Sequence, residues 1–483
     1  MKPVLKIGRS AFVKAQAAQS GLLIDARNYY RTLCRALEQA ERYVIVSGWQ
    51  FESGVRLLRG TDAEAARHPV KLLELLTALC AARPELEIYL LAWDFSLIYA
   101  RERESNQKEK FSAPCPRIHF EWDAHPDVSG SHHQKFAVID GAVAFLGGID
   151  LCDARWDDCE HLSEHPDRVN VVGDPCKPYH DVQACFTGPI VSPLVELFAE
   201  RWQRACGQRL RLHEPPAPAA HCELQRLSDG CAELVAASEL GLSRTQADSR
   251  AEPALIGEIL ALFSDAIASA EQLIYAETQY FTSRTVAKVL IDRMRDATRP
   301  KLDIVIFLPH GADTPMEKYA LEDTQESVLC EVLAAASEHG HGLCLLYPAS
   351  RNADGSETAT FIHSKILIVD DRLLMVGSPN LTERSVALDS ELAVTWECSP
   401  EDAALGDWIR NIRTRLLAEH SGLPPSEFAE QRGLCAKLDL LIARGTSRLR
   451  RRAVAEPGLL GPLLAGIVDP GDSELKKGVL SGS

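Results

Sequence analysis

The chain has 483 residues, of which 46% are hydrophobic and 25% are charged, a composition typical of two or three folded domains and not of a disordered protein. Its formal net charge of −16 argues against nucleic acid as a partner, because binding to phosphates depends on Lys and Arg, and it disfavours permanent attachment to an anionic membrane. The N-terminus lacks a signal-peptide core, no run is long enough to cross a bilayer, and the 14 cysteines include no Cys-x-x-Cys pair. We therefore expect reduced thiols in a cytoplasmic protein that has no transmembrane segment and is at most peripheral at a membrane.

Residues 1–211 alternate helix and strand signals and are predicted to form a first lobe. Helical periodicity from about Asn28 to Ala40 precedes a buried strand at Arg42–Phe51, and a helix at Pro69–Ala82 precedes a second strand at Leu86–Asp94. This alternation predicts an α/β fold with a mixed sheet flanked by helices, in which ligands bind beyond the strand ends.

Four tryptophans lie near such ends or beside the polar segment described next: Trp49, Trp93, Trp122 and Trp156. They could form an aromatic wall for a quaternary ammonium group through cation–π contacts, or they could be ordinary core and rim aromatics.

A polar pattern interrupts two apolar strands between Ser131 and Asp150. His133 and Lys135 are two residues apart, so on a strand they share one face, whereas Asp140 has the opposite parity and ends the strand as a structural partner. Gly147 and Gly148 end the second strand, where glycine allows backbone N–H groups to approach a bound group.

The segment after this hairpin, residues 157–165, is rich in potential metal ligands. Cys159, His161 and His165 are the candidates for a metal site, but their spacing fits no common zinc pattern, and an acidic solvated loop explains the composition better. We therefore predict no metal and no cofactor.

Residues 212–231 are predicted to be a linker, proline-rich at its start, before a second lobe at 232–420. The second lobe repeats the plan of the first, with helices at Ile256–Ala270 and Asp323–Glu338 and strands at Gln272–Phe281, Leu302–Leu308 and Gly342–Tyr347.

Residues 421–483 form a C-terminal extension. Its basic run Arg448–Arg452 and its apolar run Leu459–Val468 could contact a membrane surface, but Gly and Pro interrupt any amphipathic helix there. A basic helix end followed by a strand or loop packed on the body of the protein is the better interpretation.

The polar pattern of the first lobe recurs between Phe361 and Asn380. His363, Lys365, Asp370 and Gly377 repeat the spacing of His133, Lys135, Asp140 and Gly147. Ser378 and Asn380 share a face by the same rule, and the imidazole, ammonium, hydroxyl and amide together describe an anion site. The repeat predicts two lobes of one fold whose paired motifs line a single pocket between them.

This spacing, His-x-Lys, four residues, Asp, six residues and Gly-Gly/Ser, resembles the signature that the phospholipase D superfamily carries twice. The resemblance runs from about Tyr43 to about Trp408 and is strongest to the eukaryotic-type enzymes and their bacterial relatives. It includes four further segments: Gly147–Trp156, Pro178–Gln183, Ile274–Phe281 and Asp389–Ala393.

The chemistry of a phosphodiester indicates a role for each residue. Lys135, Lys365, Asn380 and Ser378, with backbone N–H groups at Gly147, Gly148 and Gly377, would hold the anionic phosphate. One histidine would attack phosphorus and the other would protonate the leaving alcohol, then deprotonate the incoming water or alcohol. Spacing does not distinguish the two histidines; the resemblance implies that His133 is the nucleophile and His363 the general acid/base.

Carboxylates complete the predicted site. Asp140 and Asp370 close the two motifs, and Asp181 and Glu391, in strands that follow them, are the candidates for orienting the histidines. Asp150 takes the place that Asn380 has in the second copy, and a carboxylate there cannot donate to phosphate.

The resemblance implies a phospholipase D that cleaves the head group of a glycerophospholipid at a membrane surface through a phospho-histidine, with water or an alcohol as acceptor. Three alternatives stay open: a cardiolipin synthase-like phosphatidyltransferase, a nuclease, which the net charge disfavours, and a non-catalytic binding protein, against which both intact motifs argue.

Overall fold

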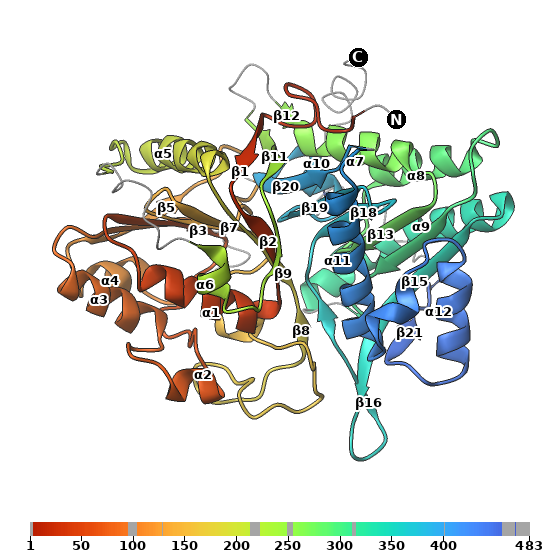
Figure 1. Cartoon of the computed structure of the whole chain (residues 1–483). Helices are drawn as coiled ribbons and strands as arrows, with labels where there is room; N and C mark the ends of the chain where they lie inside the picture. Colours follow the sequence, from red (N-terminus) through yellow and green to blue (C-terminus); the bar gives the residue numbers. More distant parts are fainter. Residues whose placement is uncertain are drawn as a thin grey trace. The chain divides into compact units, whose positions relative to one another are not determined.

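The computed structural model describes residues 3–94, 104–127, 129–212, 223–248, 255–311, 315–399, 401–455 and 469. The chain forms two compact units (Figure 1). The N-terminal unit is Lys14–Leu240, and the C-terminal unit combines Met1–Val13 with Gly241–Ser483. The proline-rich first half of the expected linker, residues 213–222, and the apolar run Leu459–Val468 lie outside the described residues. The strands β1 (Val13–Ala17) and β11 (Ser238–Ala247) carry the chain across the boundary between the units.

The N-terminal unit is built on a mixed sheet whose strands are ordered β10-β2-β9-β7-β6-β3-β4-β5. These strands are β2 (Ser20–Ile24), β3 (Tyr43–Gly48), β4 (Glu87–Trp93), β5 (Ile118–Asp123), β6 (Phe136–Ile139), β7 (Val143–Gly147), β9 (Val182–Thr187) and β10 (Glu233–Val235), and the short strand β8 (Tyr179–His180) lies outside this sheet. The α-helices are α1 (Asp25–Leu37), α2 (Gly60–Glu64), α3 (Leu72–Ala82), α4 (Gln107–Ser112), α5 (Ser192–Cys206) and α6 (Leu224–Ser228). Pairing is parallel within β3-β4-β5 and antiparallel from β3 through β6, β7 and β9 to β2 and β10.

The C-terminal unit contains a second mixed sheet, ordered β11-β20-β19-β18-β13-β14-β15-β16, with β12 beside β11 and β21 beside β15. Its further strands are β12 (Leu255–Gly257), β13 (Leu273–Glu277), β14 (Asp303–Phe307), β15 (Gly342–Arg351), β16 (Glu357–Ala359), β17 (Phe361–Ile362), β18 (Ile366–Val369), β19 (Leu373–Gly377), β20 (Glu391–Glu397) and β21 (Leu449–Arg451). The α-helices are α7 (Glu258–Ser269), α8 (Arg284–Arg295), α9 (Pro315–His339), α10 (Glu383–Ala387), α11 (Ala403–Ser421) and α12 (Leu434–Ala443).

The two units repeat one plan. The parallel strands β13-β14-β15 correspond to β3-β4-β5, and the antiparallel run β13-β18-β19-β20 corresponds to β3-β6-β7-β9. In each unit a long helix, α5 or α11, follows the last strand of that run. The predicted α/β class, with a mixed sheet flanked by helices in each repeat, is confirmed.

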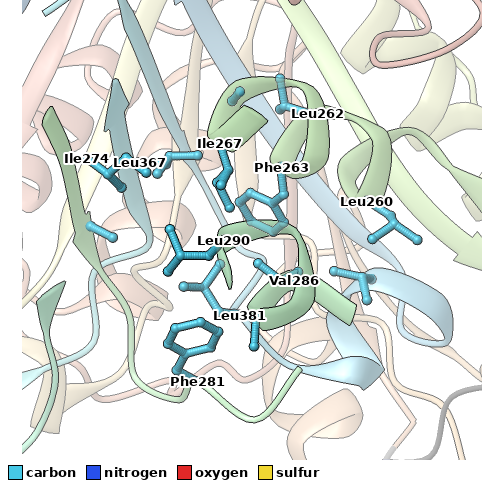
Figure 2. Packing of buried hydrophobic residues seen from close by; sticks show 14 of the residues in the cluster. Leu260, Leu262, Phe263, Ile267, Ile274, Phe281, Val286, Leu290, Leu367 and Leu381 are labelled. Carbon is cyan, nitrogen blue, oxygen red and sulfur yellow. The ribbon is translucent and has the colours of Figure 1, made fainter. Parts of the chain in front are cut away.

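Each unit has its own hydrophobic core. In the C-terminal unit, α7 and α8 pack apolar faces against β13 and β18, and Figure 2 shows Phe263, Ile267, Leu290, Ile274 and Leu367 from these elements in one cluster. All five are at least 95% buried. A leucine fully buried in this way contributes about 1.5–3 kcal/mol, so this packing holds the strands that carry the second motif.

The basic run near the C-terminus is part of the sheet. The strand β21 pairs with β15 in an antiparallel ladder. The three arginines Arg450, Arg451 and Arg452 form ion pairs with Glu357, Asp439 and Glu326. The expectation of a basic helix end at this run is wrong, because the run pairs as a strand with β15, and its charges are used within the protein.

Two further expectations concern the chain as a whole. Within the described parts, no helix combines the length and the hydropathy that crossing a bilayer requires. The 13 cysteines that fall in those parts are all free thiols, and Cys159 is the exposed one among them.

Candidate active site in two half-sites

The first half-site lies where the chain enters β6. His133 and Lys135 precede this strand, which begins at Phe136, so the expected strand position is wrong by a few residues. His133 is half-buried, and the Lys135 side chain is 2% exposed. Lys135 Nζ donates to the carbonyl of His133 at 3.2 Å and lies 3.3 Å from Asp150 Oδ2. The lysine is therefore held in place on both sides, by its own motif and by a carboxylate.

The second half-site has the same construction in the C-terminal unit. His363 and Lys365 are 5% and 1% exposed and precede β18, which begins at Ile366. Lys365 Nζ again donates to the carbonyl two residues earlier, that of His363. The motif therefore forms the same local hydrogen bond in both units, from the lysine side chain to the carbonyl of the histidine two residues earlier.

The aspartates that close the motifs bind backbone. Asp140 has a φ of 51°, and its carboxylate accepts from the N–H groups of Glu41, Arg42 and Tyr43 at 2.7–2.8 Å. These three N–H groups lie at the start of β3, so the carboxylate ties the end of β6 to the neighbouring strand.

Asp370 repeats this arrangement, with a φ of 55° and bonds from Glu271, Gln272 and Leu273 at 2.7–2.8 Å. In both motifs the contacts match the structural role that strand parity indicates. A catalytic part for either carboxylate stays a prediction.

Asp150 and Asn380 occupy equivalent places but offer different chemistry. Asp150 Oδ1 accepts from Trp49 N at 2.9 Å, and Asn380 Oδ1 accepts from Gln279 N at 3.2 Å. Because its oxygen is used in this way, Asn380 has its amide N–H₂ as a donor, whereas the second oxygen of Asp150 faces Lys135. Only the second half-site has an amide that could donate to a phosphate at this place.

The glycines at the ends of β7 and β19 are explained by protein packing. A Cβ on Gly147 would overlap the carbonyl of Val182, and a Cβ on Gly377 would overlap the carbonyl of Leu392. At Gly148 it would overlap the carboxylate of Asp181. The sequence predicts that a bound ligand comes close to the backbone of these glycines. In the structure, the neighbouring strand or the candidate orienting carboxylate comes close to it instead.

The two candidate orienting carboxylates also lie in equivalent places. Asp181 immediately precedes β9, and its Oδ1 accepts from Val182 N at 2.8 Å. Glu391 begins β20 and accepts from the hydroxyls of Ser378 and Ser385, the second at 2.7 Å. The hydroxyl of Ser378 therefore donates to the carboxylate of Glu391 in its own half-site, and this bond fixes the direction of the hydroxyl.

The four tryptophans do not share one wall. Trp49 and Trp93 stack with ring centroids 5.7 Å apart, whereas Trp122 packs edge-on against Phe120. Trp156 is 2% exposed and lies in the core of the N-terminal unit. The stacked pair follows β3 and ends β4, at the strand ends where a ligand is expected.

The proposed trio of metal ligands after the first motif separates in the structure. Cys159 is exposed, and among the described residues neither it nor His165 belongs to a group with metal-ligand spacing. His161 instead lies in a buried cluster, 2.9 Å from Asp157 and 3.6 Å from Asp25. Asp25 also lies 3.0 Å from Nδ1 of His180, the residue before Asp181.

This cluster brings together residues that are far apart in the sequence. Asp25 has a φ of 65°, and its backbone N–H donates to the carbonyl of Asp181 at 2.9 Å. Ligand atoms of Asp25, His161 and His180 lie within 4.8 Å of one another, a spacing that would admit a small cation. In the structure, the cluster ties Asp25, at the start of α1, to His180 and Asp181, the two residues that precede β9. Sequence patterns gave no sign of it beyond the polar composition of residues 157–165.

Comparison with known proteins gives two family matches. The model described as Phospholipase D matches residues 36–286, just over half of the chain. The model described as Cardiolipin synthase, PLD-like domain, matches residues 263–411. The matches together include both histidine–lysine motifs.

Individual relatives are distant. Phospholipase D A of Dictyostelium discoideum is 25% identical over 469 residues, covering 84% of this chain and 36% of that protein. Phospholipase D alpha 1 of Nicotiana tabacum is 22% identical over 554 residues, covering 86% and 66%. The chain thus spans about a third of the first relative and just under two thirds of the second.

Among solved structures, the phosphatidylserine synthase of Haemophilus influenzae Rd KW20 superposes with a TM-score of 0.53 at 13% identity. The superposition covers 88% of this chain and 93% of that one, and it shows a shared fold.

Proposed function

Because the chain belongs to the phospholipase D family, we propose that it is a phosphodiesterase or phosphatidyltransferase that cleaves the head-group phosphodiester of a glycerophospholipid. The observation that carries the proposal is the duplication of one half-site. Each unit supplies a histidine and a buried lysine from an equivalent segment of chain. Each also supplies a carboxylate beside a later strand: Asp181 immediately before β9, and Glu391 at the start of β20.

The two half-sites offer what the reaction requires. A phosphodiester repels an incoming nucleophile until its oxygens meet positive charge, which the ammonium groups of Lys135 and Lys365 and the amide of Asn380 can supply. The proposal requires both imidazoles to reach one phosphorus atom, with the two motifs lining a common pocket.

The proposed reaction has two balanced steps. His133 attacks phosphorus, a P–N bond forms, and the P–O bond to the head-group alcohol breaks as His363 donates a proton to the leaving oxygen. Water or an alcohol then gives its proton to His363 and attacks phosphorus, and the P–N bond breaks. Asp181 and Glu391 are proposed to orient the two histidines. The assignment of His133 as nucleophile follows the family resemblance.

A second candidate is transfer of the phosphatidyl group to an alcohol that is itself a lipid. The match of residues 263–411 to the cardiolipin synthase model favours it, since that segment includes the whole second motif. The two candidates share every step up to the phospho-histidine and differ in the acceptor.

The test measures head-group release from phosphatidylcholine, phosphatidylethanolamine and phosphatidylglycerol vesicles, with ethanol or phosphatidylglycerol as competing acceptor. We expect His133→Ala and His363→Ala each to abolish release, while His68→Ala, at an exposed position, retains it. A brief reaction with phosphorus-labelled lipid, followed by mass spectrometry, should place the label on His133. Full activity in either motif variant would overturn the proposal, and cleavage of DNA or RNA in place of lipid would redirect it to the nuclease.

A further inference from the structure

The residue between the histidine and the lysine is buried in both motifs. Gln134 is 1% exposed, and Ser364 is 0% exposed. Each one enters a polar cluster of its own unit, which we call the first anchor (Gln134, Arg201, Asp123 and Ser47) and the second anchor (Ser364, Glu277, His420 and Tyr275).

The first anchor centres on the guanidinium of Arg201, which α5 supplies. Arg201 Nη1 donates to Gln134 Oε1 at 2.9 Å and to Ser47 Oγ at 2.7 Å, and Nε donates to Asp123 Oδ2 at 2.8 Å. Ser47 Oγ also lies 3.4 Å from the backbone carbonyl of Gln134. The motif is thus held through both the side chain and the main chain of one residue.

The second anchor centres on the carboxylate of Glu277, the last residue of β13. Its Oε2 accepts from the hydroxyl of Ser364, and its Oε1 accepts from the hydroxyl of Tyr275. His420 Nε2, from α11, lies 2.9 Å from the same Oε1. All four side chains are at most 1% exposed.

The two anchors occupy the same place in the repeated fold. Ser47 faces Phe136 across the ladder, and Glu277 faces Ile366, so in both units the strand next to the motif contributes a polar residue at the first pair after the lysine. In both units the helix that follows the last strand of the antiparallel run contributes another, Arg201 or His420. The position of the anchor is therefore the same in the two units, but its central group differs. That group is a guanidinium in the N-terminal unit and a carboxylate in the C-terminal unit.

The stability of the fold does not explain why these two polar clusters are buried. Replacing buried ionic groups by well-packed apolar ones is often neutral or stabilising, so burial of charge at one equivalent place in both units is not explained by the folding free energy. Hydrogen bonds differ from apolar contacts in fixing direction, so a buried polar network can specify one arrangement of the chain. Catalytic side chains require this, because a displacement of about 1 Å can lower a rate about 100-fold.

We propose that Gln134 and Ser364 are positioning residues, which the two anchors hold so that the histidine and lysine on either side point to the reacting phosphate. This inference rests on the proposed function for its kinetic readout. It assigns Arg201, Glu277 and His420 a role in setting the direction of the motifs.

The second anchor is tested with Ser364→Ala. The matched control is Ser264→Ala, a serine 7% exposed whose hydroxyl donates to the Leu260 carbonyl at 2.7 Å in α7. We expect kcat to fall about 10- to 100-fold in Ser364→Ala with KM within about twofold, and to stay within about twofold in the control. Both variants should lose similar stability, since each removes one hydroxyl bond. A kcat within twofold of wild type in Ser364→Ala overturns the second anchor.

The first anchor is tested with a pair of variants. Gln134→Leu removes the acceptor of Arg201 and is expected to lower kcat by a similar factor. Gln134→Glu keeps an acceptor at the same place and is expected to restore most of the rate. Equal rates in the two variants overturn the first anchor, because a merely structural role would not distinguish them.

A readout that is independent of turnover separates this inference from the proposed function. The imidazole signals of His133 and His363 in ¹⁵N-edited NMR, assigned with single His→Gln variants, report the surroundings of each ring. We expect Ser364→Ala to shift the His363 signals and leave those of His133 in place, with the converse for Gln134→Leu. If the wild-type protein cleaves no phospholipid, the proposed function fails and this readout still decides: unshifted signals overturn the anchors.

Discussion

His132 precedes the histidine of the first motif, and we expect it to make stability depend on pH. The side chain is 0% exposed, lies 3.4 Å from Asp123 and has its ring 5.0 Å from that of His125. Burial and the Arg201 guanidinium lower the pKa of His132 from 6.5 to about 4, although Asp123 acts in the opposite direction. In the unfolded chain the pKa returns to about 6.5.

The sign follows from proton binding. Between pH 6.5 and 4 the unfolded chain binds a proton at this position and the folded protein does not, so the free energy of unfolding falls as the solution is acidified. Between pH 7 and pH 5, these two pKa values give a loss on the order of 2 kcal/mol from His132. Asp123 stays ionised throughout this window, because Arg201 and His132 outweigh burial and hold its pKa below the usual range.

His132→Gln isolates this contribution, because the amide keeps a donor for Asp123 but does not titrate. We expect the free energy of unfolding of the wild-type protein to fall by about 2 kcal/mol more than that of the variant between pH 7 and pH 5. Urea unfolding followed by Trp fluorescence at pH 7, 6 and 5 measures the difference, and carboxylates common to both proteins cancel. A difference that is constant to within about 0.5 kcal/mol would show that His132 is not held neutral by its surroundings.

Three further predictions use other parts of the structure. Burial raises the pKa of Glu258 to about 7, so between pH 5 and pH 8 the wild-type protein should lose about 2 to 3 kcal/mol of stability relative to Glu258→Gln, as measured by urea unfolding. Gly147→Ala should cost about 3 kcal/mol, because the new methyl group overlaps the carbonyl of Val182, whereas Gly54→Ala, whose nearest contact would be at 3.5 Å, should cost less than about 1 kcal/mol; thermal unfolding compares them. Ellman's reagent should modify Cys159 first in the native protein, since it is the exposed thiol among the described residues, and Cys159→Ser should remove that fast phase.

The sequence predicted the repeated architecture well because the determinants are local. Alternating apolar residues and the fixed spacing of each motif identify the hairpins β6-β7 and β18-β19, and these hairpins lie where expected. The strand position of the motif residues was wrong for a tertiary reason. The ladder between β3 and β6 ends at the pair Ser47 and Phe136, so the residues before Phe136 are not paired as a strand with β3, although the carbonyl of Lys135 still accepts from Gly147 N.

The sequence could not predict the anchors, the Asp25 cluster or the packing role of the glycines. Arg201 lies 67 residues after Gln134, and Glu277 lies 87 residues before Ser364, so no periodicity links the members of either anchor. An arginine on a helix with other charged residues and a glutamate at a strand end are also what a solvated surface would show. Burial, which the sequence does not give, distinguishes the two cases.

Equal spacing in the two motifs hides unequal electrostatics. Lys135 has a carboxylate 3.3 Å away, that of Asp150, and two buried groups of opposite charge close to each other act on distant charges mainly as a dipole. At the equivalent place near the second motif stands the neutral amide of Asn380, which adds a donor and no negative charge. The anchors differ in the opposite direction, since the first holds the guanidinium of Arg201, paired with Asp123, and the second holds the carboxylate of Glu277. The repeated fold therefore presents two half-sites of one shape and different charge, which agrees with the proposal that one histidine attacks and the other carries the proton.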